Sequence, residues 1–172
     1  RRQRQMCIRD SQCYALAEQG KDFDNELKAI KERYYEIIHG LSLDLSLNEE
    51  FKTIKKNFQE KAGSDYAASR GEYLNGIVMA NYLGYEFVDA AEVIRFNHDG
   101  SFNAAVTNKI MSKRLERVER AVIPGFFGAE EDGTIRTFSR GGSDITGSIV
   151  ARAVNANLYE NWTDAVSYTH LT

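Results

Sequence analysis

The spacing of the apolar residues changes near residue 84, and this change constrains the fold more than any other feature of the sequence. Before it, apolar residues recur every three or four positions, which is the spacing of one face of an α-helix. The pattern predicts three helices, over residues 22–39, 48–62 and 69–83. After it, short segments rich in β-branched and aromatic residues indicate strands.

Strands and helices are expected to alternate in the second half of the chain. Five segments have the composition of strands: residues 85–89, 92–96, 121–123, 135–138 and 158–162. Two helices are expected, one over residues 106–117 and one from Ser143 or Asp144 to Val154, with Ile145 on its inward face and Asn157 as its C-cap. Because helices that alternate with short apolar strands cover the faces of a sheet, the pattern predicts an α/β fold.

Composition and charge limit the classes of protein to which the chain could belong. With 172 residues, 42% of them hydrophobic, it is long enough for one globular domain with a sizeable core. The 22 Lys and Arg residues do not exceed the 25 Asp and Glu residues, which argues against a general nucleic-acid binder. No apolar run approaches the roughly 20 residues of a membrane helix, and two cysteines cannot build a disulfide framework. We expect a cytoplasmic protein without membrane or nucleic-acid partners.

The two ends of the chain differ in pattern from the segment between them. Residues 1–11 carry four arginines without periodicity, and residues 165–172 are equally unpatterned. Both resemble translated sequencing adapters, so we expect them to be non-native flanks around a body of residues 12–164. The alternative is a native basic arm and a frayed C-terminal tail. Without the N-terminal arginines, the body is acidic.

One glycine-rich segment has the residue types of an anion-binding site. Gly141 and Gly142 allow a tight turn and the close approach of a ligand, and a helix that begins at Ser143 would direct its first N–H groups there. Arg140 offers a planar fork for a carboxylate or a phosphate. Asp144 fits beside Mg²⁺, as a group that orients a donor, or as a partner of the helix dipole. A strand-to-helix turn capped by Ser143 explains the same segment without a ligand.

Three other segments each allow a structural and a functional interpretation. Residues 124–128 follow a predicted buried strand, and form either a ligand-facing loop or a turn whose phenylalanines pack in the core. Ser69 and Glu72 could form a capping box at a helix start, or Glu72 could face an ammonium group. Thr163 and Asp164 follow the last predicted strand, where ligands of open α/β sheets bind, or they form a β-turn.

Taken in order, these segments resemble the aspartate kinase family of the amino-acid kinase superfamily. The resemblance is carried by four motifs: Ser69-x-Gly71-Glu72, Pro124-Gly125-Phe126-x-Gly128, Ser139-Arg140-Gly141-Gly142-Ser143-Asp144 and Trp162-Thr163-Asp164. It covers residues 12–164 and implies a three-layer α/β/α sandwich around a largely parallel sheet, here incomplete. It also implies ATP-dependent phosphorylation of the side-chain carboxylate of L-aspartate to 4-phospho-L-aspartate, the first step towards lysine, threonine and methionine. Mg²⁺ would accompany the ATP, and the parent enzyme would be a homo-oligomer.

The resemblance further implies roles for particular residues. Glu72 would hold the amine of the substrate, and Arg140 would bind its carboxylate. Asp144 would be the catalytic residue near the transferred phosphate, and no resident metal ligand is implied. The remaining matched positions would line the substrate site (Phe126, Gly141, Gly142 and Ser143) and the nucleotide site (Thr163 and Asp164).

The sequence also departs from the family pattern. Family members begin with a strand and loop like Lys-Phe-Gly-Gly-Thr, whose lysine contacts the transferred phosphates, and nothing here matches it. Asn161 stands where relatives often have an apolar residue. We therefore expect an internal fragment of a kinase domain that has no measurable kinase turnover by itself. The alternatives are another amino-acid kinase, acting on glutamate, carbamate or a nucleotide, and a non-catalytic module that binds aspartate.

Overall fold

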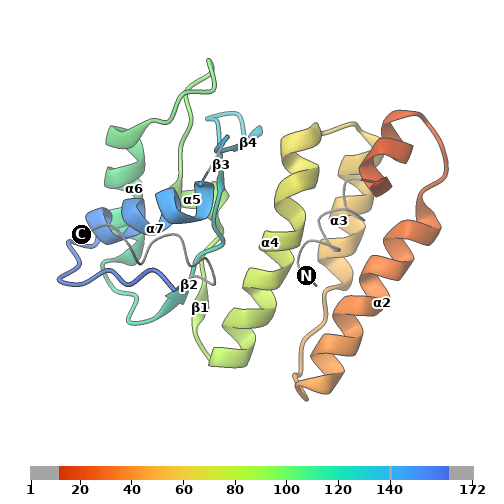
Figure 1. Ribbon diagram of the computed structural model, residues 1–172, viewed down its shortest axis with the longest axis horizontal. Coiled ribbons are helices and arrows are strands. Elements are labelled where there is room, and N and C mark those ends of the chain that lie inside the picture. The colour runs from red at the N-terminus through yellow and green to blue at the C-terminus, as the bar shows by residue number, and fades with distance from the viewer. Residues whose placement is uncertain (1–11, 140, 163–172) are drawn as a thin grey trace, which may run out of the picture.

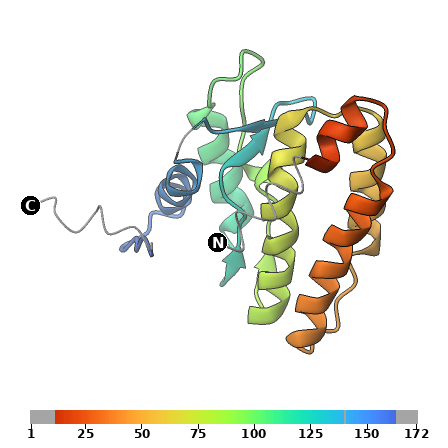
Figure 2. The same cartoon turned by 45° about the vertical axis from the view of Figure 1, so that its right-hand side comes forward.

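The computed structural model describes residues 12–139 and 141–162 and begins with a layer of helices (Figure 1). Residues 12–18 are helical, and the sequence pattern did not predict this turn. Three longer helices follow: α2 (Asp24–Gly40), α3 (Asn48–Gln59) and α4 (Ser64–Leu83). Figures 1 and 2 both show α4 between the layer of α2 and α3 and the strands of the second half.

The second half of the chain mixes short strands with helices, as the sequence pattern predicts. Its elements are, in order: β1 (Glu86–Phe87), α5 (Ala90–Val93), α6 (Ala104–Leu115), β2 (Ala121–Val122), β3 (Phe127–Ala129), β4 (Ile135–Thr137) and α7 (Gly142–Ala153). Strands β1 and β2 pair in parallel, whereas β3 and β4 form an antiparallel hairpin. The parallel pair, between helices, is the arrangement expected of an α/β fold.

Two groups of buried side chains form the core, one on each side of α4. The first lies among the N-terminal helices and includes Tyr34, Phe51, Phe58 and Leu74. The second lies among the strands and α5 to α7, and includes Val88, Val93, Ile94, Met111 and Phe127. Tyr73 of α4 packs against both groups, so α4 is a shared wall that connects the helical layer to the strands.

Helix α4 begins earlier than the sequence pattern predicts, at Ser64. The carboxylate of Asp65 in its first turn accepts hydrogen bonds from the backbone N–H and the hydroxyl of Thr137, at 3.3 and 3.0 Å. Ser69 is fully buried inside the helix, and its hydroxyl donates to the carbonyl of Tyr66. The predicted helix start at Ser69, and with it the capping box with Glu72, is therefore wrong.

The segment 92–96 is not the strand that its composition predicts. The side chain of Asp89 accepts a hydrogen bond from the N–H of Ala91 at 3.0 Å and caps the short helix α5. Only Arg95 and Phe96 make isolated bridges to other segments. A local cap has therefore turned the first half of this apolar segment into a helical turn.

The end of the described chain also differs from the prediction. Residues 158–162 are not a strand, and α7 ends with Val154 rather than Asn157 as its C-cap. A Cβ atom at Gly147 would lie 2.4 Å from the hydroxyl of Tyr159, so the missing side chain of Gly147 lets Tyr159 pack directly on α7. The segment is thus held against a helix instead of a sheet.

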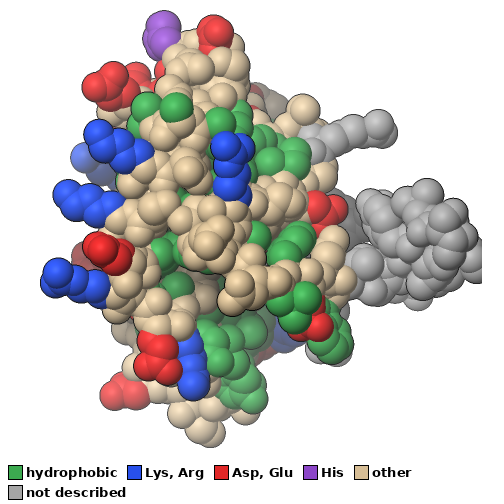
Figure 3. All heavy atoms as spheres, turned by 90° about the vertical axis from the view of Figure 1, so that its left-hand side faces the viewer, with side chains coloured by type: hydrophobic (Ala, Val, Ile, Leu, Met, Phe, Trp, Pro, Cys, Tyr) green, Lys and Arg blue, Asp and Glu red, His purple; other side chains and the backbone are tan. Residues whose placement is uncertain are grey.

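Several large hydrophobic side chains remain exposed, and hydrophobic side chains gather on the lower part of the face in Figure 3. Ile145, expected on the inward face of its helix, is 39% exposed, whereas the next residue, Thr146, is 4% exposed. Among the described residues, no helix combines the length and the apolar character needed to cross a membrane.

Candidate functional site

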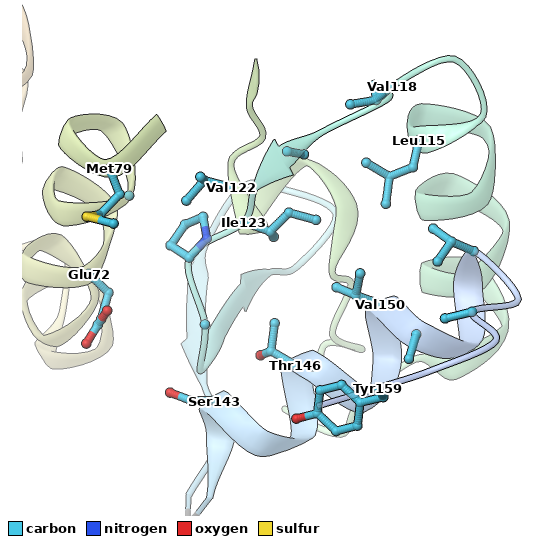
Figure 4. A pocket seen from close by; sticks show the side chains of 18 of the residues that line it. Glu72, Met79, Leu115, Val118, Val122, Ile123, Ser143, Thr146, Val150 and Tyr159 are labelled. Carbon is cyan, nitrogen blue, oxygen red and sulfur yellow. The ribbon is translucent and has the colours of Figure 1, made fainter. Parts of the chain in front are cut away.

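A cavity of about 820 Å³ opens between α4, β2 and α7 (Figure 4). Its apolar walls come from these elements and the segments beside them, and include Met79, Val122, Ile123, Val150 and Tyr159. Its polar side chains include Glu72 from α4 and Ser143 and Thr146 from α7. In Figure 4, the Ser143 hydroxyl points towards α4, on which Glu72 lies. The structure therefore brings together two residues that are 71 positions apart and that the sequence motifs singled out.

The helical layer fixes the turn of α4 that carries Glu72. The Tyr34 hydroxyl, from α2, donates a hydrogen bond of 2.9 Å to the carbonyl of Gly71. Tyr34 is 2% exposed and belongs to the first core, so this bond connects the core to the turn before Glu72. Glu72 itself is half-buried and lines the cavity from this fixed turn of the helix.

A buried arginine connects the same turn to strand β3. The guanidinium carbon of Arg70 lies 4.4 Å from the ring centroid of Tyr66, 4.6 Å from that of Tyr73 and 5.5 Å from that of Phe127. Burial lowers the pKa of Arg70, because it removes the charged form from water. The faces of the three rings offset part of that cost through cation–π contacts. Because Phe127 belongs to the 124–128 segment and is the first residue of β3, the cluster connects the helix of Glu72 to that segment.

The 124–128 segment lies partly at the cavity and partly in the core. Pro124 and Gly125 line the cavity, whereas Phe127 is fully buried in the core. Phe126 is half-buried, is not among the residues that line the cavity, and has a left-handed backbone with φ of 64°. A Cβ atom at Gly125 would lie 3.1 Å from the Cα of Ser143, so this loop and the start of α7 pack closely.

Helix α7 presents its N-terminal end at the polar end of the cavity. Gly141, with φ of 60°, is the N-cap, and the first helical hydrogen bond runs from the N–H of Ile145 to the carbonyl of Gly141 at 2.9 Å. The amides of the first helical turn before Ile145 therefore have no partner within the helix, and the helix dipole is positive there. The predicted turn into a helix is present, with the helix beginning at Gly142, and anion binding there stays a prediction. The alternative of a cap at Ser143 is wrong, because the N-cap is Gly141 and no side chain caps this helix.

Asp144 lies in the first turn of α7 but does not line the large cavity. It lines a neighbouring cavity of about 360 Å³, together with Ile145 and Ser148. Its carboxylate accepts a hydrogen bond of 3.1 Å from the side-chain amide of Asn161. Sequence reasoning noted Asn161 only as a departure from the family pattern, and nothing local connects the two residues.

Three predicted site residues lie outside the described part of the chain. These are Arg140, Thr163 and Asp164, whose roles stay predictions. Within the described ranges, no group of three or more His, Cys, Asp or Glu side chains could hold a metal ion.

The cavity combines a negatively charged group on one wall with the positive end of a helix on another. Glu72 is a carboxylate on one wall, and the positive end of α7 lies at Ser143 on the other. A carboxylate suits an ammonium group, and a helix N-terminus suits an anion. The site therefore fits a small zwitterion such as an amino acid.

The chain belongs to the amino acid kinase family, whose sequence profile matches residues 16–166. This membership confirms the α/β fold class expected from the sequence.

Among the relatives that the chain resembles are several aspartokinases. It is 35% identical to aspartokinase 3 of Bacillus subtilis over 151 residues, which are 80% of this chain and 33% of the relative. It is 26% identical to the lysine-sensitive aspartokinase 3 of Escherichia coli, over 86% of this chain and 37% of the relative. The chain thus spans about a third of the length of these relatives.

The chain also resembles solved structures of aspartate kinases. The crystal structure of Clostridium acetobutylicum aspartate kinase matches 93% of this chain and 37% of its own, with a TM-score of 0.87 and 46% identity. Aspartokinase III of Escherichia coli in complex with aspartate and ADP shares the fold, with a TM-score of 0.68 at 24% identity.

Proposed function

We propose that this chain is the aspartate-binding part of an aspartate kinase. The reaction transfers the γ-phosphoryl group of ATP to the side-chain carboxylate of L-aspartate and gives 4-phospho-L-aspartate and ADP. The observation that carries the proposal is the cavity in which Glu72 lies opposite the N-terminal end of α7. The similarity to aspartokinases supports aspartate as the amino acid.

The binding residues follow from the chemistry of the zwitterion. Glu72 holds the ammonium group, and Arg140 binds the α-carboxylate through its planar fork. Ser143 and the glycine amides at the start of α7 donate hydrogen bonds to the substrate. Phe126 supports the loop that closes this end of the site.

The chemical step brings several anions together. A side-chain carboxylate oxygen of aspartate attacks the γ-phosphorus, while the bond from that phosphorus to the bridging oxygen of ADP breaks. The repulsion must be offset by Mg²⁺, which enters with ATP, and by fixed donors. Asp144 is an anion itself, so it acts near the transferred phosphate by orienting Mg²⁺ or a donor. Thr163 and Asp164 contact the nucleotide. The homo-oligomeric parent enzyme and the cytoplasmic location remain predictions from the sequence.

Calorimetric titration of the chain with L-aspartate tests the binding half of the proposal. We expect Glu72→Gln to weaken the affinity about 10-fold to 100-fold, the effect of losing one hydrogen bond to a charged group. Glu49→Gln is the matched control, because Glu49 is exposed on α3 and pairs with Lys52. A chain that binds no aspartate, or binds it equally well with Gln at position 72, would contradict the proposal.

A further inference from the structure

The backbone of Phe126 is held in an unfavourable conformation by two hydrogen bonds. Its φ of 64° lies in the left-handed region, which costs a residue with a side chain on the order of 1 kcal/mol. Its N–H donates to the hydroxyl of Thr146 at 3.0 Å, and its carbonyl accepts from the N–H of Phe138 at 2.8 Å. Both polar backbone groups of this residue therefore have partners in other segments.

Thr146 connects this loop to the start of helix α7. Its side chain is 4% exposed, and its hydroxyl donates a hydrogen bond of 2.8 Å to the carbonyl of Gly142 while it accepts the one from Phe126. A hydroxyl has one proton to donate, so the two bonds use it as donor and as acceptor in a fixed direction. Figure 4 shows the Thr146 side chain between Ser143 and Val150 at the cavity wall.

The packing around this hydroxyl leaves little room for movement. A Cβ atom at Gly142 would lie 2.5 Å from the Cβ of Phe126. One at Gly125 would lie 3.1 Å from the Cα of Ser143. The 124–128 loop and the first turn of α7 therefore pack closely at two places, Gly142 against Phe126 and Gly125 against Ser143.

We infer that Thr146 is a positioning residue of the aspartate site. Its hydroxyl fixes the position of Phe126 relative to Gly142. This relative position determines how the first turn of α7, with Ser143, faces Glu72. The inference rests on the proposed function and extends it to a residue that none of the motifs includes. Thr146 acts through the loop and the helix turn rather than on the reacting atoms.

Two variants separate the hydroxyl from the shape of the side chain. Thr146→Val keeps the shape and removes the hydroxyl, whereas Thr146→Ser keeps the hydroxyl and removes the methyl group. The first measurement is amide hydrogen exchange at Phe126, expressed relative to the amide of Leu74 in the α4 core so that global stability cancels. The second is the affinity for L-aspartate by calorimetry.

With Val at position 146, we expect the relative exchange of Phe126 to rise, and the affinity for aspartate to fall, by about tenfold or more. With Ser, both stay within about threefold of the parent chain. Unchanged exchange or unchanged affinity in Thr146→Val overturns the inference, as does a Ser variant that behaves like Val. If Thr146→Val does not fold, Thr146→Ala is compared with Thr146→Ser, because both variants lack the methyl group and differ only by the hydroxyl. A parent chain that binds no aspartate contradicts the proposed function. The exchange of Phe126 relative to Leu74 then still tests whether Thr146 holds the 124–128 loop against α7.

Discussion

Gly142 occupies a position at which a methyl group has no room. An added Cβ would meet the Cβ of Phe126 at 2.5 Å, the Cα of Phe126 at 2.8 Å and the Cβ of Phe138 at 3.0 Å. Because these atoms are backbone or next to it, Gly142→Ala should lower the free energy of unfolding by about 1–3 kcal/mol. Urea denaturation measures this directly.

Gly40, the last residue of α2, provides the matched control. Nothing lies within 4 Å of a Cβ atom built there, and alanine is favoured over glycine in helices. Gly40→Ala should therefore leave the stability unchanged or raise it. If Gly142→Ala is as stable as the parent chain, the close contact between Phe126 and the start of α7 is not present in solution.

Single residues of the site could be predicted only where their chemistry is local. The motifs identified Glu72 and Ser143, and the structure places both at one cavity. The sequence pattern does not reveal Thr146, because the spacing of apolar residues predicts a buried helix face and a buried hydroxyl does not contribute to that spacing. The contact between Asn161 and Asp144 depends on how the chain returns over α7, which no local pattern reveals.

At the scale of elements, the helices were predicted better than their ends. The helical spacing places α2, α3 and most of α4 correctly, because packing of an apolar face determines them. The first turn of α4 contains Asp65, which contacts Thr137, 72 residues away, and a sequence pattern cannot show such a partner. Segment 92–96 has a strand composition, but the cap at Asp89 decides its conformation.

The β3–β4 hairpin depends on one buried carboxylate. Glu130 is 4% exposed, accepts a hydrogen bond from the guanidinium of Arg136, and lies 2.9 Å from Nδ1 of His98. The hydrogen bond from Arg136, followed by that from His98, lowers the pKa of Glu130 below its ordinary value. A carboxyl group with a lowered pKa in the folded state stabilises the fold above its unfolded-state pKa, and this stabilisation is lost as the pH falls through the lower value.

We therefore expect Glu130→Gln to destabilise the chain at pH 7 and to lose this effect in acid. The difference in the free energy of unfolding between the parent and the variant should shrink below about pH 4, near the ordinary pKa of glutamate. Urea denaturation across this range measures it, with the exposed neighbour changed in Glu131→Gln as the control. A difference that does not depend on pH would argue against the ionised Glu130 as the anchor of the hairpin.

At the scale of the whole molecule, strand β2 has one edge that β1 does not occupy. The carbonyls of Arg120 and Val122 accept hydrogen bonds from Glu86 and Val88 of the β1 segment, at 3.1 and 3.0 Å. Because successive residues of a strand direct their backbone groups to opposite sides, those of Ala121 and Ile123 point away from β1, and both residues line the cavity. This edge of β2 and the proposed aspartate site therefore border the same cavity.

The chain spans about a third of its curated relatives, so the complete reaction is best tested within a whole enzyme. A hybrid can be built in which residues 16–162 replace the matching segment of Clostridium acetobutylicum aspartate kinase, which is 46% identical. The relative then supplies the parts of the enzyme that lie outside this segment. The unmodified relative and the isolated 172-residue chain are the controls, and the isolated chain should release no ADP.

The most direct test of the central claim is ADP release by this hybrid with and without L-aspartate. We expect release that requires L-aspartate, and a rate at least about 100-fold lower in the hybrid with Asp144→Asn, the scale of a lost electrostatic group at a reacting centre. A hybrid that folds like the relative but releases no ADP with aspartate, or one whose rate Asp144→Asn leaves unchanged, would contradict it.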